Sequence, residues 1–102
     1  MLGLRPNCEL CDKDLPPSAP DARICSYECT FCADCVGDVL HDVCPNCGGG
    51  FVPRPIRPQH AWRPETGLQY DAPDPQRRSL RYPMDDVHAL TARLEHVPPA
   101  DR

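Results

Sequence analysis

The sequence predicts a small metal-bound α+β domain with little regular secondary structure, followed by a tail rich in proline and arginine. All eight cysteines lie between Cys8 and Cys47 of a chain of 102 residues. The two-residue gap that lets two thiolates reach one metal ion occurs four times among them. Fourteen prolines against two phenylalanines and one tryptophan argue against one large packed core. Bound metal therefore has to hold the fold.

Two zinc ions are the cofactors that we expect. A structural zinc contributes roughly 10–16 kcal/mol of apparent binding free energy, against about 5–15 kcal/mol for the stability of a whole domain. Disulfides would require an oxidising compartment, and the first residues contain no apolar segment of signal-peptide length. An iron or iron–sulfur site is the alternative, because the spacing of Cys29, Cys32 and Cys35 resembles part of a ferredoxin run.

The cysteine module is expected over residues 1–52, and its elements follow from local patterns. Prolines between residues 16 and 20 predict a loop, since they can continue neither a helix nor a central strand. Alternating polar and apolar residues at 23–27 predict a short strand that carries Cys25. Apolar residues at helical spacing predict a short helix from about residue 33 to 40, and Phe51 and Val52 predict a returning strand.

The tail divides into three parts. Residues 53–83 are rich in proline and arginine without apolar periodicity, which predicts an extended or disordered linker. Residues 84–97 have acidic residues at their start and one apolar stripe, which predicts a short amphipathic helix. This helix could cover the thin core of the module or bind a partner, or the segment could be disordered. Residues 98–102 are expected to be a disordered end.

Charge is distributed unevenly around a formal net charge of −4. Residues 1–50 carry three basic and eight acidic side chains, whereas residues 51–81 carry six arginines and three acids. Nucleic-acid binding through segment 54–81, with Trp62 and Tyr70 stacking on bases, is one alternative function. The acidic module and a pI near 5.4 oppose it, because they weaken long-range attraction to phosphate.

The cysteine spacing alone permits two pairings, with the four ligands of each site either consecutive or interleaved along the chain. The gaps in order are two, thirteen, three, two, two, eight and two residues, with a final Cys44-Pro-Asn-Cys47. This series resembles the RING finger family, in which the pairs interleave as a cross-brace. The resemblance implies site 1 from Cys8, Cys11, Cys32 and Cys35, and site 2 from Cys25, Cys29, Cys44 and Cys47.

The RING resemblance also implies a function, that of a ubiquitin-ligase-like recruiter with Leu10 as an apolar partner contact. Three departures count against it. Cys29 stands where a histidine is usual, Gly48-Gly49-Gly50 where an arginine often follows the last ligand, and Val39 and Leu40 where a tryptophan is common. Leu10 is equally compatible with the module's own core.

A second resemblance covers most of the module and includes residues other than the ligands. It rests on Leu-Arg-Pro-Asn-Cys at 4–8, Cys-Asp-Lys-Asp-Leu-Pro-Pro at 11–17, the run Ala-Arg-Ile-Cys-Ser-Tyr-Glu-Cys-Thr-Phe-Cys-Ala-Asp-Cys at 22–35 and Cys-Pro-Asn-Cys-Gly-Gly at 44–49. These segments resemble the bacterial family called domain of unknown function 1272, short cysteine-rich proteins presumed to bind zinc. The resemblance implies a cytoplasmic bacterial protein, and it implies no particular activity.

Catalysis is not expected. Catalytic zinc keeps an open coordination position, whereas eight cysteines fill two closed sites. The other possible ligand within the module, His41, is expected to be a surface residue. No phosphate-binding loop and no Ser/His/Asp arrangement occurs. We predict a structural zinc module that acts as a protein-interaction or regulatory adaptor, with another protein as partner and no membrane association. Zinc storage or thiol redox sensing is a further alternative.

Overall fold

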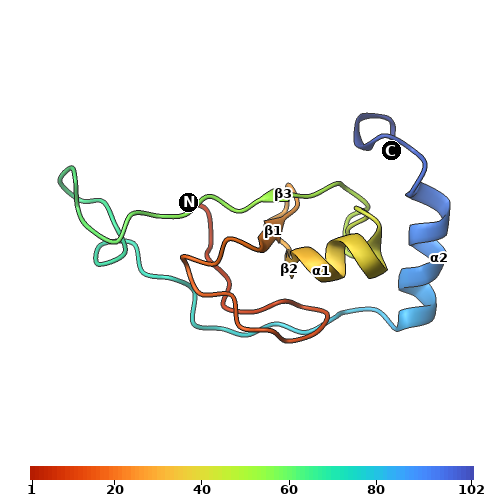
Figure 1. The fold of residues 1–102 in the computed structure, drawn as a ribbon, viewed down its shortest axis with the longest axis horizontal. Helices are drawn as coiled ribbons and strands as arrows, with labels where there is room; N and C mark the ends of the chain where they lie inside the picture. The colour runs from red at the N-terminus through yellow and green to blue at the C-terminus, as the bar shows by residue number, and fades with distance from the viewer.

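A three-stranded antiparallel sheet and one short helix form the centre of the cysteine module, and they contain two of its cysteines, Cys32 and Cys35 (Figure 1). The structure is a computed structural model that describes all residues from Met1 to Arg102. In chain order the elements are β1 (Ala22–Ile24), β2 (Thr30–Cys32), α1 (Ala33–Cys35), the π-helical η1 (Val36–Leu40), β3 (Val52–Pro53), α2 (Met84–Leu94) and the 3-10 helix η2 (Pro99–Asp101). The predicted small α+β class is confirmed.

The sheet has the order β2-β1-β3, and its register places Ala22 opposite Cys32 and Ile24 opposite Thr30. Strand β1 ends before Cys25, earlier than the predicted strand 23–27, because the chain turns there. Two backbone bonds close this turn, from Glu28 N–H to Cys25 O at 3.0 Å and from Cys25 N–H to Cys29 O at 3.2 Å. Pro53 is tolerated in β3 because an edge strand needs no second ladder donor.

The predicted helix starts directly after Cys32 and runs through α1 and η1 to Leu40. It ends where His41 and Asp42 adopt left-handed backbone angles, with φ of 49° and 61°. Leu40 is fully buried, and Phe31 and Phe51 pack edge to face at 5.5 Å. Six of the twelve residues in the main buried cluster are cysteines, so ordinary apolar side chains supply only half of this core.

Residues 54–83 contain no helix or strand, yet much of this segment is bound to the module. Arg54 is only 4% exposed, and its backbone N–H donates to Ala22 O at 2.9 Å, so the packed unit continues beyond the expected boundary at residue 52. Further along, Asp74 N–H donates to Leu4 O at 3.0 Å. The part between these anchors projects as an arm, coloured green to teal in Figure 1, on which Trp62 is 76% exposed.

The C-terminal helix α2 lies beside η1, at the end of the molecule opposite the arm (Figure 1). Its Val87 joins the main buried cluster. The helix ends at Leu94 rather than at the expected residue 97, because Val97 N–H donates to Leu94 O in a turn. The end 98–102 differs from the disordered end that we expected. It forms η2, and the Arg102 guanidinium donates to three carbonyl oxygens, those of Val97, Asp42 and Gly48. No helix is long and apolar enough to cross a membrane.

Candidate metal centres

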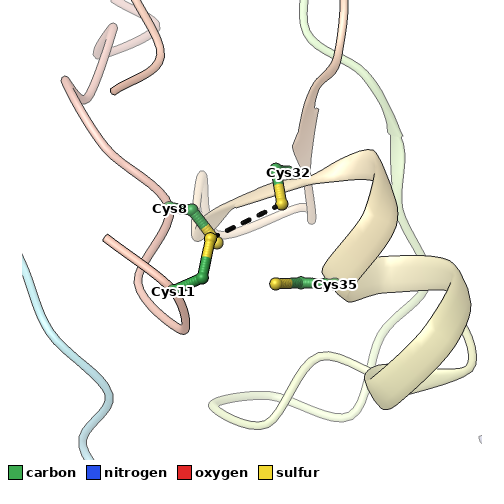
Figure 2. Close-up of side chains that lie close together, drawn as sticks. All are labelled: Cys8, Cys11, Cys32 and Cys35. Carbon is green, nitrogen blue, oxygen red and sulfur yellow. Dashed lines mark hydrogen bonds between the residues drawn. The ribbon is translucent and has the colours of Figure 1, made fainter. Parts of the chain in front are cut away.

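The first cysteine group joins the N-terminal loop to the start of the helix. The Sγ atoms of Cys8, Cys11, Cys32 and Cys35 all lie within 4.8 Å of one another. Figure 2 shows the two loop cysteines facing Cys32, at the end of β2, and Cys35, in α1. Cys11 Sγ and Cys32 Sγ are 3.8 Å apart. A tetrahedral zinc with Zn–S bonds of about 2.3 Å places its sulfurs about 3.8 Å apart, so these thiols fit one ion.

The second group contains Cys25, Cys44 and Cys47, whose Sγ atoms also lie within 4.8 Å of one another. Cys29, predicted as the fourth ligand of this site, lies outside that limit. Its buried thiol still hydrogen-bonds with the thiols of Cys25 and Cys44. The structure therefore gathers seven of the eight predicted ligands into two groups and leaves the eighth beside the second. Membership of the two groups alternates along the chain, Cys8 and Cys11 grouping with Cys32 and Cys35, and Cys25 with Cys44 and Cys47.

Backbone N–H groups point at the sulfurs from the residue two positions after a cysteine. Tyr27 N lies 3.4 Å from Cys25 Sγ, and Gly49 N lies 3.4 Å from Cys47 Sγ. The same relation holds at Cys8, Cys11 and Cys44, with the N–H groups of Leu10, Lys13 and Asn46. Gly48, directly after the last cysteine, has a positive φ of 79°. Such N–H donors stabilise thiolates rather than thiols.

Within each group, the thiols ionise unequally. Hydrogen bonds from the thiols of Cys29 and Cys44 lower the pKa of Cys25 to about 3. Hydrogen bonds with the thiols of Cys25 and Cys29 in turn raise the pKa of Cys44. In the first group, burial is the main cause that raises the pKa of Cys35, followed by its bond with Cys32. Crowded thiolates repel one another, so they share protons that a divalent cation would displace.

Other predicted residues lie away from these groups. His41 is half exposed, with Nδ1 4.0 Å from a Glu95 oxygen, and belongs to neither group. Leu10, the partner contact implied by the RING resemblance, is partly buried and packs against the core. Sequence reasoning missed Glu9 and Asn46, which lie inside the first and last Cys-x-x-Cys loops and hydrogen-bond to each other at 3.1 Å. Nothing in a single sequence distinguishes them from solvent-exposed loop residues.

A small α+β module built around two groups of free cysteines has the character of a metal-binding module. Residues 1–57 match the family described as "Protein of unknown function (DUF1272)", and the chain belongs to this family. An uncharacterized protein of Rhizobium meliloti (strain 1021) is 64% identical over 58 residues, which cover 57% of this chain and 69% of that protein. No solved structure matches the chain. The matched segment contains all eight cysteines and ends shortly after Arg54.

Proposed function

We propose that the chain binds two structural zinc ions in an interleaved, RING-like cross-brace. Site 1 is Cys8, Cys11, Cys32 and Cys35, and site 2 is Cys25, Cys29, Cys44 and Cys47. The observation that carries the proposal is the gathering of thiols into two alternating groups, one with the 3.8 Å sulfur separation that tetrahedral zinc requires. Bound zinc would supply cross-links between loop and sheet. Four thiolates per ion leave no coordination position for water or substrate, so we propose no catalysis.

The module in this proposal acts as an adaptor that presents a rigid surface to another protein in the cytoplasm. A groove of about 730 Å³ next to site 2 supports this role, and its lining includes Leu2, Ile24, Tyr27 and Val52. Tyr27 is 73% exposed, and Val52 is also mostly exposed. Exposed aromatic and aliphatic side chains on a fixed backbone are the usual anchors of protein interfaces.

Nucleic-acid binding is a weaker proposal, because four of the six arginines in segment 54–81 already bind the chain itself. Arg54 and Arg57 donate to backbone carbonyls, whereas Arg77 and Arg78 pair with carboxylates. A ubiquitin-ligase-like role is disfavoured in a similar way, since Leu80 of the tail lines the same surface groove as Leu10. Thiol redox sensing remains the second candidate, because each cysteine group has one exposed member, Cys11 or Cys47.

Native mass spectrometry of the full chain, purified with a reducing agent, tests the metal proposal. We expect a mass increment of two zinc ions and no reaction of the cysteines with an alkylating reagent until a chelator is added. A stoichiometry below two, or an iron chromophore, would refute it.

The adaptor role is tested with nuclease-treated lysate from bacteria that carry this protein and with purified bait. Tyr27→Ala should lose specific partners that the wild type retains. Tyr70→Ala is the matched control, because Tyr70 is also exposed but lies on the arm. Equal capture by both variants contradicts a partner site at the groove, and recovery only of nucleic acid from a parallel lysate without nuclease treatment would favour the alternative.

A further inference from the structure

We propose that Glu9 couples the two metal sites, so that filling one raises the affinity of the other. The inference rests on the proposed binding of two metal ions. Glu9 lies between Cys8 and Cys11, the two loop ligands of site 1, and is only 7% exposed. A buried carboxylate beside thiolate ligands is electrostatically unfavourable unless specific donors compensate it. Its position therefore needs a structural reason.

The Glu9 carboxylate reaches two segments that belong to site 2. Its Oε1 accepts a hydrogen bond from Asn46 Nδ2 at 3.1 Å, and Asn46 lies inside the Cys44–Cys47 loop. Its Oε2 accepts from Thr30 N–H at 3.2 Å, and Thr30 follows Cys29 directly. The backbone N–H of Glu9 also donates a hydrogen bond to Thr30 O at 3.1 Å. One side chain from the site 1 loop thus contacts both segments that supply ligands to the proposed site 2, the one that follows Cys29 and the Cys44–Cys47 loop.

The partner groups depend on this contact. The Asn46 side chain has no other hydrogen bond, since its buried Oδ1 atom has no partner. Glu9 therefore fixes the orientation of this side chain and connects it to the first loop. Arg5 adds a weaker bond to Oε2 at 3.4 Å, which offsets part of the negative charge.

Coupling follows from the order in which these segments lose conformational freedom. A metal ion in site 1 fixes the Cys8–Cys11 loop and with it the Glu9 carboxylate. The fixed carboxylate then orders the Cys44–Cys47 loop and the start of β2, so the second ion meets ligands that are already arranged. By linkage the effect is reciprocal, and an ion in site 2 favours site 1 equally.

The experiment is a zinc titration of the reduced, metal-free full chain followed by native mass spectrometry. At one equivalent, two independent and equal sites leave about half of the molecules with one ion, whereas tenfold coupling leaves about a quarter. We expect the wild type at or below about a quarter. Glu9→Gln keeps the size of the side chain but removes its charge and one acceptor, and it should raise the one-ion species to about half or more.

Two further variants separate coupling from general loss of structure. Glu28→Gln is the matched control, because Glu28 also lies next to a cysteine and its carboxylate also accepts a backbone bond, but from Gly3 N–H at 2.9 Å, which lies outside both sites. It should behave as the wild type. Asn46→Ala should reproduce Glu9→Gln, and the double variant should be no worse than either single one, since both remove the same contact. If Glu9→Gln does not fold, the Asn46→Ala variant tests the coupling instead.

The outcomes distinguish this inference from the proposal beneath it. A wild type that never binds two ions refutes the metal proposal. A wild type that binds two ions with half or more of the molecules in the one-ion form at one equivalent refutes the coupling alone. The coupling is also refuted if Asn46→Ala matches the wild type, or if Glu28→Gln shifts the distribution as much as Glu9→Gln.

Discussion

The tail is attached to the module through Asn7, and we predict that Asn7→Ala releases it while leaving the metal sites loaded. Asn7 is 1% exposed, and its amide pairs with the backbone of Arg78 as a neighbouring strand would. Its Nδ2 donates to Arg78 O at 2.7 Å, and its Oδ1 accepts from Arg78 N–H at 3.0 Å. At about 0.5–1.5 kcal/mol for each bond, the loss amounts to about 1–3 kcal/mol of docking free energy. That corresponds to roughly a 5- to 150-fold larger opening constant for this segment.

Amide hydrogen exchange reports the opening constant directly, because the Arg78 N–H group is the donor of one of the two hydrogen bonds to Asn7. Its exchange rate in Asn7→Ala should rise by the same factor, whereas Gln76 N–H, which donates to Asp74 Oδ1 within a local turn, should change much less. Asn7→Asp should keep the acceptor but lose the donor and face Asp12, so its tail should also open. Unchanged exchange at Arg78 with intact zinc content would refute the attachment, and a uniform rise in all amides would show global destabilisation instead.

Three other outcomes are expected. Gly50→Ala should free the C-terminal segment and speed proteolysis near residue 95, because a Cβ there would lie 2.9 Å from Pro99 Cγ; Gly3→Ala, with open space around it, is the control. Arg54→Ala should lower the unfolding free energy in urea by about 2–4 kcal/mol, since three buried or partly buried carbonyls lose a charged donor, and a change below about 1 kcal/mol would contradict this. Lowering the pH from about 7.5 to about 5 should release zinc and unfold the module together, because protons compete with zinc for the thiolates. Circular dichroism measures the unfolding, and zinc release without unfolding would show that the fold does not depend on the metal.

The sequence predicts the module well because its signals are local. Cysteine spacing and apolar positions at helical intervals each depend on a few neighbouring residues, and the structure confirms the helix and the α+β class. The pairing of the ligands could not be predicted from local signals in the same way. Spacing permitted two arrangements, and only the resemblance to RING fingers favoured the interleaved one that the thiol positions support.

The tail could not be predicted in the same way, because it docks mostly through hydrogen bonds to backbone carbonyls. Arg57 donates to Leu2 O at 2.7 Å and to Asp71 O at 3.0 Å, and Arg102 uses carbonyls alone. Every residue has a carbonyl, so no sequence pattern marks the acceptor. A segment rich in proline and arginine without apolar periodicity therefore has the same sequence pattern whether it is free or bound to a folded surface.

Under the proposed interleaved ligation, the two halves of the module depend on each other. Strand β2 begins directly after Cys29 and ends at Cys32, so a proposed ligand of site 2 and a proposed ligand of site 1 flank the two residues between them. A strand rises about 3.3 Å per residue and resists bending, so displacement at one end shifts the other. The hydrogen bonds between Glu9 and Thr30 connect the first loop to the same strand. Because half of the buried cluster is cysteine, we expect neither half of the module to retain a sufficient core alone, so that under the proposed two-ion binding stable folding requires both ions.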